Sequence, residues 1–152
     1  MNRIILIIGI ITLAASVAKA QEIKEVDGIY FLGEERFTGT YVDSFDNGSV
    51  KQEIKIKDGE KNGPVNIYFE DGKLNEVRSY KNNKMHGKWV MYNNDKIKVS
   101  VARYKNGQKH GKWMIWDDTG NLLYELHYKN GEKTGTWKNY DEQGKLVNQR
   151  KY

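Results

Sequence analysis

Cysteine is absent from the 152 residues of the chain. The protein therefore forms no disulfide, and it has neither a cysteine-based metal site nor a thiol nucleophile. A lipid anchor that depends on a cysteine behind a cleavage site is excluded as well. The chain must be stabilised by its fold alone.

A long apolar run occurs at the N-terminus, in residues 1–20, MNRIILIIGIITLAASVAKA. Arg3 gives a short basic region, apolar residues follow, and Ala18-Lys19-Ala20 fits the small-x-small cleavage rule. This pattern predicts a secretory signal peptide helix that is cleaved after Ala20. The apolar run is short for the roughly 20 residues of a spanning helix, so cleavage is favoured over an uncleaved membrane anchor. We expect an exported protein that is periplasmic, on the cell surface or secreted.

An excess of one sign of charge is also lacking. The formal net charge is +5, and Arg3 and Lys19 leave with the signal peptide. Lysines stand beside aspartates and glutamates throughout the rest of the chain. Such mixing is typical of a solvated two-sided sheet and argues against a nucleic-acid partner. On this basis the charge carries no functional signal.

Glycines recur at a fixed spacing of 24 residues, and they are Gly39, Gly63, Gly87, Gly111 and Gly135. Two residues after each glycine stand Tyr41, Val65, Trp89, Trp113 and Trp137, and five residues after it Ser44, Tyr68, Tyr92, Trp116 and Tyr140. Ile56, Tyr80, Tyr104, Tyr128 and Tyr152 repeat with the same spacing. Repetition of this kind dictates the architecture. It divides the chain into an N-terminal capping strand or hairpin, 21–38, and five units, 39–62, 63–86, 87–110, 111–134 and 135–152, the last of them incomplete.

Each unit has the pattern of a β-hairpin. In unit 111–134, apolar and polar residues alternate from Leu122 to Tyr128, which is the period of a strand. Asn130-Gly131 then supplies a tight turn, and Asn83 stands for that glycine two units earlier. The pattern predicts about ten strands in an all-β antiparallel meander that is more a ribbon than a ball. Because Asp95-Lys96-Ile97 departs from the Asp-Gly-Lys pattern of other units, we expect its turn to be distorted.

The unit resembles the MORN repeat in its bacterial variant. The resemblance rests on the glycine, the aromatic two residues later, Asp/Asn-Gly-Lys-Leu, and Tyr-Lys-Asn-Gly-x-x-His-Gly, and it covers residues 39–152. It implies an elongated, single-layer twisted sheet of successive hairpins that serves as a binding or spacing module. Some bacterial relatives are labelled as the antitoxin component of a toxin–antitoxin pair.

Residues with catalytic or metal-binding chemistry form no recognisable constellation in the sequence. His86 and His110 share one repeat position, but Asn62 and Thr134 occupy it in other units, which favours a polar turn residue over a metal ligand. No nucleophile elbow and no phosphate-binding loop occurs. We therefore predict a protein that is not an enzyme and that has no catalytic residue, no metal and no cofactor.

The aromatic residues are the remaining candidates for function. We expect the tryptophans, the tyrosines from Tyr80 to Tyr152, and the set from Tyr68 to Tyr140 each to stack in register across units. Packing is the simpler role for these rings, because a single-layer sheet has no second layer to cover them. An exposed apolar face nevertheless commonly marks an interface. The candidate binding face consists of Trp89, Trp113, Trp137, Tyr92, Trp116 and Tyr140.

We therefore predict a scaffold that binds a protein or a component of the cell envelope, without stable membrane insertion once the signal peptide is removed. One alternative is an antitoxin-like or immunity protein that neutralises a cognate toxin. Another is a carbohydrate- or envelope-binding module that uses the aromatic ladders. The sequence leaves the oligomeric state and the binding face open.

Overall fold

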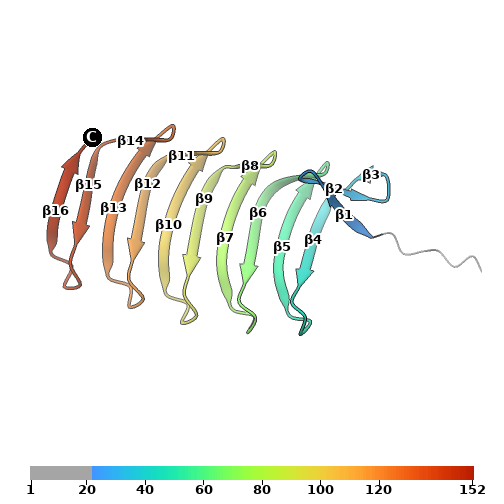
Figure 1. Ribbon diagram of the computed structural model, residues 1–152, viewed down its shortest axis with the longest axis horizontal. Coiled ribbons are helices and arrows are strands. Elements are labelled where there is room, and N and C mark those ends of the chain that lie inside the picture. Colours follow the sequence, from blue (N-terminus) through green and yellow to red (C-terminus); the bar gives the residue numbers. More distant parts are fainter. Residues whose placement is uncertain (1–21) are drawn as a thin grey trace, which may run out of the picture.

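The computed structural model describes residues 22–152, so the predicted signal peptide lies outside it. Sixteen strands follow one another (Figure 1): β1 Ile23–Val26, β2 Ile29–Leu32, β3 Glu35–Arg36, β4 Gly39–Ser44, β5 Val50–Lys57, β6 Glu60–Tyr68, β7 Leu74–Lys81, β8 Lys84–Met85, β9 Gly87–Tyr92, β10 Lys98–Lys105, β11 Gln108–Lys109, β12 Gly111–Trp116, β13 Leu122–Lys129, β14 Glu132–Lys133, β15 Thr136–Tyr140 and β16 Leu146–Lys151. Within these residues there is no helix with the length and apolar character to cross a membrane.

The main sheet is an antiparallel meander. Ten strands lie side by side in chain order, from β4 to β16 (Figure 1). The short strands β8, β11 and β14 fold back onto β7, β10 and β13, which brings the sheet to 13 strands. The predicted all-β meander of hairpins is confirmed, whereas the three short strands were not predicted.

The hairpin turns follow the residues that permit a positive φ. Asn130 and Gly131 have φ of 50° and 90°, as a tight hairpin between right-twisted strands requires. Asn83, at the position of Gly131 two units earlier, has φ of 60°. Asparagine therefore replaces glycine there without changing the turn.

The turn of unit 87–110 is not distorted, so that expectation was wrong. Lys96 adopts φ of 63° where the other units have glycine. Its N–H donates to the Asn93 carbonyl over 3.0 Å, just as the N–H of Gly120 donates to the Asp117 carbonyl over 3.1 Å. The side chain of Asn93 holds the turn by accepting from the N–H groups of Asp95 and Ile97. A lysine thus takes the left-handed conformation because the surrounding hydrogen bonds fix it.

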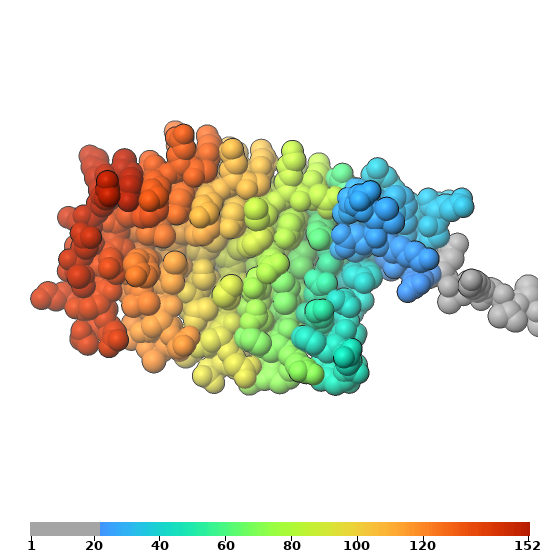
Figure 2. Space-filling model, viewed as in Figure 1, coloured from blue at the N-terminus to red at the C-terminus, as the bar shows by residue number. Residues whose placement is uncertain are grey.

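A second layer covers the first strands of the main sheet. Strands β1, β2 and β3 form a small antiparallel sheet, which packs over one corner of the main sheet (Figure 2). It places Tyr30, only 2% exposed, on Ile54, Ile56 and Val65. The N–H of Tyr30 donates to the carbonyl of Gly59 over 2.9 Å, and burial raises the pKa of its phenol. The buried core of the protein is therefore concentrated at this end.

Candidate interaction faces

One face of the main sheet carries a continuous ladder of rings, and we call it the ladder face. The rings alternate between tyrosine and tryptophan, with centroids 4.7–5.8 Å apart, in the order Tyr80, Trp89, Tyr104, Trp113, Tyr128, Trp137 and Tyr152. Tilted pairs at this separation are a favourable arrangement of aromatic side chains. Each tryptophan has a tyrosine on both sides.

This arrangement differs from the expected separate stacks. The tryptophans do not stack on one another, because the tyrosine strand of each unit lies between two tryptophan strands. In unit 111–134 the register places Trp113 opposite Leu126 and Gly111 opposite Tyr128. Glycine leaves open space opposite the tyrosine, and the neighbouring tryptophan ring leans into contact with it. The two series therefore form a single ladder.

The indole N–H groups of the ladder are hydrogen-bonded within the chain. The indole N–H of Trp89, Trp113 and Trp137 donates to the carbonyl ten residues earlier, over 3.1, 3.0 and 2.9 Å. The Lys109 ammonium lies 4.8 Å from the Trp113 centroid and 5.0 Å from that of Tyr128. Lys133 repeats this contact one unit later, on Trp137 and Tyr152. Such contacts are typical of packing residues, whose ring edges and faces are already used.

The third predicted series of rings, Tyr68, Tyr92, Trp116 and Tyr140, lies on the opposite face, and we call these four residues the aromatic row. Trp113 and Trp116 are three residues apart in one strand, so their side chains leave the sheet on opposite sides. The predicted binding face thus combined residues of two faces. Among residues 22–152 no ring pair joins members of the aromatic row, which distinguishes them from the ladder.

An open hollow separates two members of the aromatic row. Its volume is about 460 Å³, and its lining includes Tyr68, Leu74 and Tyr92. The hydroxyl of Tyr68 donates to Glu53 over 2.8 Å, and this bond holds the pKa of that carboxyl below its usual range. The ring is therefore fixed from one side while its other side borders the hollow. A hollow of this size suits a bulky side chain or a sugar ring.

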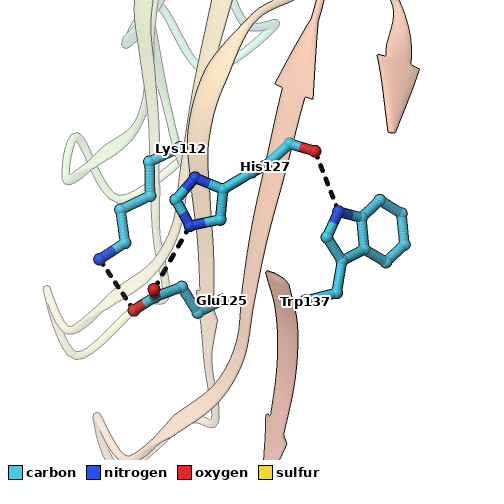
Figure 3. Close-up of polar contacts among 4 residues, drawn as sticks. All are labelled: Lys112, Glu125, His127 and Trp137. Atoms are coloured by element: carbon cyan, nitrogen blue, oxygen red, sulfur yellow. Dashed lines mark hydrogen bonds and ion pairs between the residues drawn. The ribbon is translucent and has the colours of Figure 1, made fainter. Parts of the chain in front are cut away.

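Polar side chains cross the same face beside the aromatic row. The Lys112 ammonium lies 2.8 Å from a Glu125 oxygen, and His127 lies 3.4 Å from the other oxygen. The bond from Lys112 lowers the pKa of the Glu125 carboxyl. Figure 3 shows these three side chains on one side of β13 and Trp137 on the other. Polar and ladder residues therefore alternate across a single layer.

The two aligned histidines lie at the hairpin turns. The N–H of Asn106 donates to Nδ1 of His86, and that of Asn130 to Nδ1 of His110, each over 3.4 Å. Each histidine thus links its turn to the turn of the next unit. This geometry agrees with the interpretation of a polar turn residue.

Cations that are dispersed in the sequence are brought together by the sheet, a grouping that the interpretation of the charge did not consider. Exposed cations gather on the face of the aromatic row, at the strand ends near β8 and β11, and we call it the basic face. They are Lys81, Lys84, Lys88, Arg103, Lys105 and Lys112. The signal was present in the sequence, since the 24-residue spacing and strand alternation together assign each charge to a face.

Comparison with known proteins identifies the repeat. A family model described as "MORN repeat variant" matches residues 61–82, 109–130 and 133–152. The family is a non-catalytic repeat module that generally mediates interactions with proteins or membranes. The search of curated proteins found no match.

Proposed function

From a chain that is built of MORN repeats of the variant type, we propose an exported, non-enzymatic scaffold that binds a partner protein across several repeats of its basic face. The observation that carries the proposal is the difference between the two sets of rings. Ladder rings are engaged by neighbouring rings, by backbone carbonyls and by lysines. Within the described residues no ring pair joins members of the aromatic row, and two of its members, Tyr68 and Tyr92, border an open hollow.

Export is supported by the sequence of residues 1–20. It is tested by the mass of the protein recovered outside the cytoplasm, which should correspond to a chain that begins at Gln21. An intact N-terminus that fractionates with the membrane would overturn the export proposal and would favour an uncleaved anchor.

The binding face is tested by photo-crosslinking from adjacent residues of β12. Met114 and Ile115 are both partly buried, and their side chains lie on opposite faces of one strand. A photoreactive residue at 114 should crosslink a protein in the exporting cell, whereas the same residue at 115 should not. Adducts at 115 alone would move the site to the ladder face, and adducts at neither position would overturn the scaffold proposal.

The alternative of toxin neutralisation is decided by the identity of the adduct. A crosslinked partner that is toxic when expressed alone, and harmless when this chain is co-expressed, would make the protein an immunity factor. The same face would then serve a narrower purpose.

A further inference from the structure

The basic patch, which consists of Lys81, Lys84, Lys88, Arg103, Lys105 and Lys112, is not balanced by nearby acids. All six side chains are exposed. Lys112 contacts Glu125, and within residues 22–152 the other five have no carboxylate at ion-pair distance. Five of the six cations, on β7 to β10, therefore form an area of positive charge without an ion-pair partner among the described residues, and Lys112 on β12 extends it.

Cations stand directly opposite each other inside this patch. Lys88 pairs with Arg103 across β9 and β10, and Lys81 pairs with Lys84 across β7 and β8. Like charges at directly opposed positions of a sheet destabilise it. The patch thus works against the stability of the strands that carry it.

The fold itself does not require these cations. The repeat position of Lys88 holds Pro64 in the preceding unit, Lys112 in the next and Thr136 in the one after, and that of Arg103 holds Ser79 and His127 in the two adjacent units. The same backbone is also built with neutral or weakly basic side chains at these positions. A role outside the fold therefore explains the cations better than a role within it.

An apolar row runs along the patch. Val77 pairs with Val90, Val90 with Val101, and Val101 with Met114, so that the four side chains form one line across β7, β9, β10 and β12. Val90, Val101 and Met114 lie two residues along their strands from Lys88, Arg103 and Lys112, respectively, and Val77 lies two residues from Ser79. Tyr92 and Trp116 follow two residues further on. The face thus carries parallel basic, apolar and aromatic rows.

We propose that the partner segment which binds this face is amphipathic, with acidic residues on the side that meets the basic patch and apolar residues on the side that meets the apolar row. This inference rests on the proposed scaffold function and adds the chemistry of its partner. Four strands at about 4.8 Å spacing extend over about 14 Å, which matches about ten helical residues. A nucleic acid or a purely anionic polymer would neutralise the cations but leave the apolar row uncovered.

The test uses a labelled synthetic peptide of about 18 residues, with glutamate on one helical side and leucine on the other. Its affinity for the purified protein is measured by fluorescence anisotropy. The double variant Lys88→Thr/Arg103→Ser places residues that other units carry at both positions, so it should fold normally. We expect it to bind the peptide about tenfold more weakly, and wild-type binding to weaken as salt rises.

A matched control removes the same charge elsewhere. Lys24→Thr/Lys145→Ser takes two cations from β1 and from the turn before β16, and it should bind within about twofold of the wild type. Equal losses in both variants would show that net charge alone attracts the peptide. A scrambled peptide that binds as well as the amphipathic one would overturn the inference, as would absence of binding to the wild type.

Other anionic partners are outcomes of the same assay. Single-stranded DNA or phosphatidylglycerol vesicles that bind more tightly than the peptide, and that lose binding in Lys88→Thr/Arg103→Ser, would replace the acidic segment. A failure of this inference can be distinguished from a failure of the scaffold proposal. If crosslinks from position 114 persist in the double variant, the face binds a partner but the basic patch does not select it.

Discussion

The apolar side chains of the ladder face are covered differently at the two ends of the main sheet. At strands β4 to β6 the ladder positions hold Ile56 and Val65, and Tyr30 from the small sheet covers them. From β7 onward the equivalent positions hold tyrosine and tryptophan, and the rings cover one another. Aliphatic side chains are too small to span the distance between repeats, whereas rings reach their neighbours. The second layer therefore lies where the ladder positions of the adjacent strands β5 and β6 hold aliphatic side chains.

This difference should also appear in cooperativity. The small sheet packs on several strands at once, so its contacts are shared. Ladder contacts join only adjacent strands. The stability of that part is therefore approximately the sum of the interaction free energies between neighbouring strands. We expect the repeats near β16 to open locally before the N-terminal core does.

The largest expected effect is at the core. Ile54 is 2% exposed, and Ile54→Ala should cost about 3–4 kcal/mol of unfolding free energy in urea melts, because a cavity remains under the small sheet. Leu126 holds the same repeat position on the open part of the ladder face and is only partly buried. Leu126→Ala should cost about half as much. Equal costs would mean that the small sheet does not provide a distinct core.

The ladder comes next. Trp113→Ala removes a ring that touches Tyr104 and Tyr128 at 5.3 and 5.2 Å. It should cost about 2–3 kcal/mol, less than for a fully buried tryptophan because the residue is only partly buried.

The matched control for this variant is Trp113→Phe, which keeps a ring but loses the indole bond to the Arg103 carbonyl. It should cost about 1 kcal/mol in the same melts. If Trp113→Ala unfolds at the same urea concentration as the wild type, the ladder does not stabilise the sheet, and its rings become candidates for binding.

Whether a feature could be predicted from the sequence depends on how far apart in the chain its contacting residues lie. The 24-residue spacing predicted strands, turns and the meander, because these depend on residues close in sequence or on equivalent positions. The small sheet breaks the spacing. The contact of Tyr30 with Val65 joins distant segments that no periodicity relates. The lean of each tryptophan toward the next tyrosine likewise depends on register, which the spacing alone does not give.

The candidate site was predicted in part for the same reason. The aromatic residues were identified, but two faces were combined into one, although alternation along β12 already separates Trp113 from Trp116. The sequence did not predict the basic patch, because Lys105 and Asp117 are near each other in sequence. Strand β12 lies between them and places them at the two opposite edges of the sheet, where the strands begin and end. The division into five units that begin at glycine stays a prediction.

A smaller effect is expected at the repeat glycines. Gly111 has φ of 73°, and a Cβ there would lie 3.3 Å from Cδ of Arg103. Gly111→Val should cost about 1–3 kcal/mol, from both backbone strain and crowding. Gly131 has φ of 90° with nothing within 4 Å of its Cβ position. Gly131→Val should therefore show the strain alone, and a larger loss there would contradict the role of crowding.

The smallest effect is expected where one repeat uses lysine for glycine. Lys96→Gly relieves a left-handed lysine at φ of 63° and should raise the unfolding free energy by about 0.5 kcal/mol, because the gain is partly offset by the extra freedom of glycine in the unfolded chain. The reciprocal change, Gly120→Lys, enforces the same conformation one unit later and should cost about 1 kcal/mol. Its turn also keeps a side chain that holds the loop, since Asp117 accepts from the N–H groups of Thr119 and Asn121. Paired urea melts measure both changes. A lower unfolding free energy for Lys96→Gly would mean that the lysine side chain itself stabilises the turn. The lysine would then contribute to the stability of that unit and would not merely be tolerated there.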